Sequence, residues 1–81
     1  MTAVFVDQTY EVHAEASPGL LPRLMQAFAK RNLTPAAVTA RCEAGEMRVA
    51  VVVQAMPAEM TAVVAGNLGQ VIGVLAVQSR P

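Results

Sequence analysis

The chain has 81 residues, of which 54% are apolar and only 4% are aromatic. A chain of this length forms one domain with a small core, so we expect Val, Ala, Leu and Met to build a core that a partner subunit helps to cover. Six basic residues balance six acidic ones. With no net charge and few aromatic side chains, the composition excludes the basic stacking surfaces of nucleic-acid-binding proteins and charge-driven membrane attachment.

Location and redox chemistry follow from a few residues. No apolar run approaches the roughly 20 residues that span a bilayer, and no basic residue precedes Arg23, as a signal peptide would require. We therefore expect a cytoplasmic protein. Cys42 is the only cysteine of the sequence, which excludes an internal disulfide and a Cys-x-x-Cys site. We therefore expect Cys42 to be a small apolar residue of a sheet and not a reactive thiol.

Polar and apolar residues alternate from Gln8 to Ala16, which predicts a strand. Glu11, His13 and Glu15 share its polar face. Three ionisable groups on one face could hold a metal, but their spacing matches no strong ligand pattern, so a solvated face is favoured. Residues 1–7 either extend this strand or pack against a partner, and the sequence leaves both open.

The stretch Ser17-Pro18-Gly19-Leu20-Leu21 separates that strand from a segment with helical periodicity. We predict a helix from Pro18 to Arg31, with Pro18 at the first helical position and Asn32 as a left-handed stop. Because Gly19 has no β-carbon, another group can approach the backbone closely at this position. The start of the helix could accept a carboxylate. A plain turn with nothing bound is the alternative, and residue types alone favour it.

Two further strands and a hairpin are predicted next. Residues 36–44 are polar enough for an edge strand, and Gly45 allows a tight reversal. Residues 47–54 contain the run Val49-Ala50-Val51-Val52-Val53, in which the side chains on both faces of a strand would be apolar. This predicts a central strand that is buried on both faces.

A second helix is predicted over residues 58–68, opened by Pro57 and ended by Gly69. A final strand over residues 70–78 and a frayed end over 79–81 complete the chain. The order strand, helix, strand, strand, helix, strand predicts an α+β, ferredoxin-like βαββαβ sandwich with an antiparallel sheet in the order 4-1-3-2 and two helices on one face. The other face, or the edge of the second strand, is then left for association.

This fold by itself does not define a function. The third strand has no aromatic residues for RNA stacking, and the Pro18-Gly19 loop has neither the Cys pair of a copper chaperone nor an Arg to hold an acyl phosphate. His13 is the only imidazole, and the sequence places no nucleophile beside it. We therefore expect no catalytic residues, no metal and no cofactor.

The residues Pro18-Gly19-Leu20-Leu21 resemble the Pro-Gly-x-Leu pattern of ACT domains, with Phe28 and Leu33 at the hydrophobic spacing of that family. The resemblance covers about residues 8–79 of a single domain over 1–81. Within the family, the ending from Asn67 to Val77 is most similar to the short regulatory subunits of acetolactate synthase.

The resemblance implies a non-catalytic regulatory role. ACT domains of this type pair through sheet edges as homodimers or larger assemblies, with an amino-acid effector between protomers. By position, Ser17, Pro18, Gly19 and Leu20 would face the effector, whereas Thr39 and Arg41 would line the interface. Many amino-acid-binding members carry Asp or Asn two positions before the proline.

Here that position is Ala16, which removes a hydrogen-bond partner for the effector's ammonium group.

Two hypotheses follow from the resemblance. The first is a regulatory subunit that binds the thiamine-diphosphate-dependent large subunit of acetolactate synthase. The second is a free-standing ACT domain that senses an amino acid or a similar small ligand.

Overall fold

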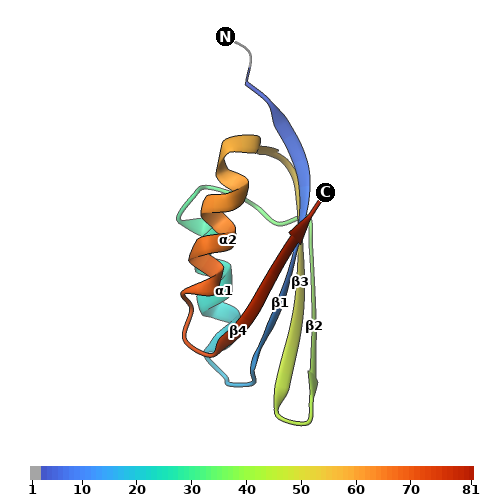
Figure 1. Cartoon of the computed structure of the whole chain (residues 1–81), viewed down its shortest axis with the longest axis vertical. Coiled ribbons are helices and arrows are strands. Elements are labelled where there is room, and N and C mark those ends of the chain that lie inside the picture. The colour runs from blue at the N-terminus through green and yellow to red at the C-terminus, as the bar shows by residue number, and fades with distance from the viewer. Residues whose placement is uncertain (1–2) are drawn as a thin grey trace.

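The computed structural model describes residues 3–81 as one antiparallel sheet with both helices on one face (Figure 1). The strands are β1 (Phe5–Glu15), β2 (Ala37–Glu43), β3 (Glu46–Pro57) and β4 (Val74–Arg80). The helices are α1 (Leu20–Ala29) and α2 (Thr61–Gly69), and a 3₁₀ turn, η1 (Ala58–Met60), precedes α2. The sheet order is β2-β3-β1-β4, which confirms the predicted ferredoxin-like sandwich.

The core lies between the helices and the face of the sheet that they cover. Alternation along β1 buries Tyr10, Val12 and Ala14, as the sequence predicts, and β3 contributes every second residue of its valine run. The Tyr10 and Phe28 rings meet edge to face with centroids 5.7 Å apart. The complete set of buried apolar residues is Tyr10, Val12, Ala14, Leu20, Leu24, Ala27, Phe28, Val49, Val51, Val53, Met56, Val64 and Leu68.

The first strand begins earlier than the alternating segment, because Phe5 pairs with Pro57 and Val6 with Met56. Of the two alternatives for residues 1–7, strand extension is therefore correct for residues 5–7, while residues 1 and 2 lie outside the described part. The pairing shifts register between Val6 and Gln8. At this irregularity the Asp7 carboxylate accepts a hydrogen bond of 2.9 Å from the Ala55 backbone N–H.

The first helix begins at Leu20, so the prediction that Pro18 occupies its first position is wrong. Pro18 lies in a turn closed by the Leu20 N–H, which donates to the Ser17 carbonyl at 3.2 Å. Pro22 is the proline of the first helical turn, where a missing N–H leaves no helical acceptor unpaired. The helix ends at Ala29, and Asn32 has φ 58°, which confirms the left-handed stop.

The last strand begins at Val74, four residues later than predicted. Gly73 has φ 97°, so the chain turns there before it can enter the sheet. The predicted frayed end is also wrong, because Ser79 and Arg80 pair with Tyr10 and Thr9.

The β2–β3 hairpin turns at Ala44 and Gly45, whose φ values of 52° and 77° confirm the predicted tight reversal. β3 is central, as expected, but only its helix-facing side is buried. On the opposite side Ala50 and Val52 stay partly exposed, because both helices cover the same face. The prediction that β3 is buried on both faces is therefore wrong for the single chain.

Candidate functional site

The strand pairing arranges side chains of the uncovered sheet face in rows that cross the strands. We call this surface the open face. One row, which we call the cationic row, contains two arginines and consists of Arg41, Arg48, His13 and Ala76. The next row consists of Thr39, Ala50, Glu11 and Gln78. A third row, beside the cationic one, contains only acidic residues, namely Glu43, Glu46 and Glu15.

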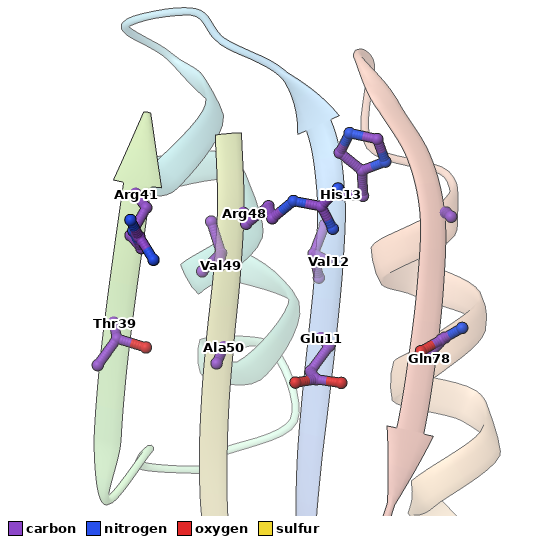
Figure 2. Close-up of a pocket in the computed structure, with 10 residues that line it drawn as sticks. Glu11, Val12, His13, Thr39, Arg41, Arg48, Val49, Ala50 and Gln78 are labelled. Atoms are coloured by element: carbon purple, nitrogen blue, oxygen red, sulfur yellow. The ribbon is translucent and has the colours of Figure 1, made fainter. Parts of the chain in front are cut away.

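A hollow of about 380 Å³ lies over the first two rows (Figure 2). The alanines Ala50 and Ala76 form an apolar part of its lining, and Glu11, Arg41 and Arg48 form a charged part. Figure 2 shows Arg48 reaching from β3 toward β1, and Glu11 lying opposite Gln78. All four strands therefore contribute to one concave surface.

The charges of the hollow differ in how they are paired. Glu11 contacts Arg80 at 3.2 Å, and the His13 Nε2 lies 2.9 Å from the Glu46 carboxylate. Arg41 is 4.0 Å from Glu43, and both side chains are 80% exposed, so this pair is weak. Within residues 3–81, no carboxylate lies within salt-bridge distance of Arg48. The guanidinium groups of Arg41 and Arg48 are therefore available to a ligand.

This arrangement suits a small zwitterion. A guanidinium group binds a carboxylate through two parallel hydrogen bonds, and the Glu11 carboxylate accepts hydrogen bonds from an ammonium group. Neighbouring rows lie about 7 Å apart along a strand, which the long Arg48 side chain can span. The hollow thus presents opposite charges beside a small apolar part of its lining.

The predicted interface residues and the predicted effector residues fall in different places. Thr39 and Arg41 both line the hollow, whereas none of Ser17, Pro18, Gly19 and Leu20 does. The loop lies at the end of the sheet beside the hairpin turn, where the Ala16 N–H donates to the Gly45 carbonyl at 3.0 Å. Ser17 and Pro18 are exposed, but Leu20 is fully buried, so only its backbone could face an effector.

Gly19 has an additional close neighbour. A β-carbon at Gly19 would lie 3.4 Å from the Arg23 guanidinium carbon. The exposed Arg23 side chain therefore folds back along α1 onto the Pro-Gly loop. It supplies a cation beside the loop, although the loop itself contains no arginine.

Sequence reasoning missed Arg48 and Gln78 as site residues. Alternation along β1 placed Glu11 and His13 on the open face, but the residues opposite them depend on pairing with β3 and β4. The signal that could have found Arg48 is the Gly45 reversal, because a tight hairpin there pairs Arg41 with Arg48.

The Glu11, His13 and Glu15 side chains do not converge on one point. Glu11 contacts Arg80 on β4, whereas His13 contacts Glu46 on β3. Across residues 3–81, no three His, Cys, Asp or Glu side chains are placed to hold a metal ion. The same residues include no helix long and apolar enough to cross a membrane.

Comparison with solved structures supports the same fold. The ACT domain of GTP pyrophosphokinase from Chlorobium tepidum superposes with a TM-score of 0.82 at 12% identity, covering 95% of this chain and 100% of that one. The regulatory subunit of aspartate kinase from Thermus thermophilus gives 0.74 at 14% identity, covering 100% and 58%. A homoserine dehydrogenase from Thiobacillus denitrificans gives 0.81 at 13% identity, covering 95% and 17%.

The fold is therefore the ferredoxin-like fold that ACT domains share. The sequence also matches the model of the ACT-like domain family over residues 2–81, and the chain belongs to that family. ACT domains are regulatory, ligand-sensing modules of amino-acid enzymes and are generally non-catalytic. No curated protein matches the sequence.

Proposed function

We propose that this chain is a non-catalytic regulatory subunit of an enzyme of amino-acid biosynthesis, and that it acts by association through its uncovered sheet. The observation that supports this is the exposure of β2, all seven residues of which are exposed. An edge strand presents free backbone N–H and C=O groups that can pair with another strand. A homodimer or larger assembly through β2 would place Thr39 and Arg41 at the interface.

We further propose that the catalytic partner is the thiamine-diphosphate-dependent large subunit of acetolactate synthase. This rests on the resemblance of the Pro-Gly loop and of the segment from Asn67 to Val77. That segment also carries Ile72 and Leu75, which are 78% and 54% exposed. Large apolar side chains exposed to this degree are the kind of surface that a partner subunit covers.

Co-purification of the two subunits tests the partner. We expect the wild-type chain to be retained by a tagged large subunit at micromolar concentration, and Ile72→Asp to be retained less because a carboxylate would be desolvated in the contact. Val63→Asp is the matched control, since Val63 is an exposed valine of α2. Failure of the wild-type chain to bind, in the absence of aggregation, would contradict this partner.

A free-standing amino-acid sensor is the second candidate, and the hollow on the open face favours it. At the Pro-Gly loop, Ala16 offers no side-chain acceptor to an ammonium group, and its N–H already donates to the Gly45 carbonyl. The hollow instead supplies Glu11 for the ammonium group and Arg48 for the carboxylate. An effector that binds at the loop would rely on backbone groups and on Arg23.

Calorimetric titration with the common amino acids tests the sensor. Saturable heat is expected for a small aliphatic amino acid, because part of the lining of the hollow is apolar. Arg48→Gln should abolish it if the ligand occupies the hollow. Gly19→Ala should abolish it if the ligand occupies the loop, and with φ −87° this substitution introduces no backbone strain. Absence of heat with every amino acid would exclude the sensor and leave the regulatory subunit.

A further inference from the structure

Both helices lie on the side of the sheet opposite the open face (Figure 1). A second polar surface lies on that side, between α1 and the end of α2. It is a groove of about 440 Å³, which we call the helix groove. From α1 and the residues that follow it, the groove is lined by Arg23, Gln26, Ala27, Lys30 and Arg31. From the end of α2, it is lined by Asn67, Gln70 and Val71.

The helix groove concentrates positive charge in a chain whose net charge is zero. Arg23, Lys30 and Arg31 are three of its six basic residues, and no Asp or Glu lines the groove. Within residues 3–81, none of the three lies in an ion pair. Five of the six acidic residues lie on strands, and the sixth, Glu59, lies in η1 at the other end of α2.

The positions of the three cations are set by the helix. Arg23 and Gln26 lie on α1 at the spacing i, i+3, and Lys30 and Arg31 follow directly after the helix, so that all four line the groove. Because a helix rises 1.5 Å per residue, the Cα atoms of Arg23 and Lys30 lie about 10 Å apart. Packing against Gly19 holds the Arg23 guanidinium at one end of the groove, and Lys30 and Arg31 lie at the other.

Side-chain amides complete the lining. Gln26, Asn67 and Gln70 each carry an NH₂ group that donates two hydrogen bonds. Cations together with amide donors, without a competing carboxylate, form the donor set that binds phosphate oxygens. A single phosphate is too short to reach both cationic ends, whereas a linear ligand with two or more phosphates is longer and carries more charge.

We infer that the helix groove binds a soluble polyphosphate anion. Arg23 would bind one end through its guanidinium fork, and Lys30 and Arg31 would neutralise the other. The site shares no residue with the hollow on the open face, and the inference does not rest on the proposed function, although Asn67, Gln70 and Val71 belong to the segment proposed to contact the large subunit. Its occupation would leave β2 and the open face free for a partner.

Titration of the ¹⁵N-labelled full chain with inorganic pyrophosphate at constant ionic strength tests the inference. We expect saturable shifts of the backbone amides of Gln26, Lys30 and Gln70, with affinity roughly tenfold higher for pyrophosphate than for phosphate, since a second charged group adds charge-assisted hydrogen bonds. Lys30→Gln should weaken pyrophosphate binding roughly tenfold on the same grounds. Arg80→Gln is the control, because it removes an exposed arginine that lies outside the groove.

Three results would overturn the inference. One is the absence of saturable shifts at millimolar pyrophosphate. Another is an equal loss of affinity in Lys30→Gln and Arg80→Gln, which would indicate non-specific charge screening. The third is binding to phosphatidylglycerol vesicles without binding to soluble pyrophosphate, which would indicate a lipid headgroup. A folded spectrum of each variant establishes that loss of binding is not loss of structure.

Discussion

At the scale of single residues, Tyr10 links the sheet to the helix layer. Its side chain is fully buried, and its hydroxyl donates to the Thr61 carbonyl at 2.9 Å, at the start of α2. The same hydroxyl lies 3.6 Å from the Met56 sulfur. Burial raises the pKa of the Tyr10 hydroxyl above its ordinary value. One polar atom therefore fixes the position of α2 against β1.

Tyr10→Phe tests this link. We expect the free energy of unfolding at neutral pH to fall by about 1 kcal/mol, the usual contribution of one hydrogen bond. The unfolded chain ionises its tyrosine at the ordinary pKa, below that of the folded chain, so wild-type stability should fall as the pH rises above about 10. The Phe variant should lack this component. Urea unfolding of both proteins at neutral and alkaline pH measures the difference, and identical pH dependences would contradict the account.

Asn32 ends α1 in the left-handed region, at φ 58°. Glycine adopts this region freely, whereas a β-carbon without a polar group is strained there. We therefore expect Asn32→Ala to lower the free energy of unfolding by about 1 kcal/mol and Asn32→Gly to change it little. Thermal unfolding compares the two variants, and an Ala variant at least as stable as the Gly variant would contradict this role.

At the scale of elements, β2 is the strand that the proposed function depends on. Val38 lies on β2 and is 42% exposed, and Val63 lies on α2 and is 43% exposed. The two valines form a matched pair, because only the first lies on the free edge of the sheet. Lysine on an edge strand opposes pairing with another strand.

Val38→Lys should weaken self-association at least tenfold, since several edge contacts of about 1 kcal/mol or less are lost together. Val63→Lys should leave self-association unchanged. Sedimentation equilibrium of the wild type and both variants measures this. Equal weakening by the two substitutions would show that the helices, and not β2, form the interface.

The sequence predicted the elements that depend on local pattern. Alternation identified β1 and its buried face, and Gly45 and Asn32 marked a turn and a helix end correctly. The errors arose where two residues could fulfil the same role or where tertiary packing decided. Pro22, rather than Pro18, lies in the first turn of α1. β4 begins later than predicted because the chain turns at Gly73, and hydrophobic periodicity does not indicate this turn.

The candidate site was less predictable than the fold. Thr39 and Arg41 were named as interface residues by the resemblance to ACT domains, and alternation places both on the polar face of one strand. Their neighbours Arg48, Glu11 and Gln78 come from three other strands, and their approach depends on long-range register. The exposed second side of β3 could not be read from its valine run either, because hydrophobicity indicates that a surface is to be buried and not whether this chain or a partner covers it.

At the scale of the whole molecule, the two sides of the sandwich differ in character. The helix side carries the three cations of the helix groove, and the open face carries opposite charges in neighbouring rows. The domain extends 47 × 18 × 18 Å, and within residues 3–81 one face of its sheet has no covering layer (Figure 1). Under the proposed function, a partner would cover that face and thereby stabilise this small domain.

Regulation of acetolactate synthase by this chain can be measured as the rate of acetolactate formation by the large subunit with and without the chain. We expect that the chain alone forms no acetolactate and that micromolar wild-type chain changes the rate of the large subunit. Val38→Lys should diminish this change if β2 pairing organises the assembly, and Val63→Lys should retain it. An unchanged rate with folded wild-type chain, together with no complex, would contradict the account.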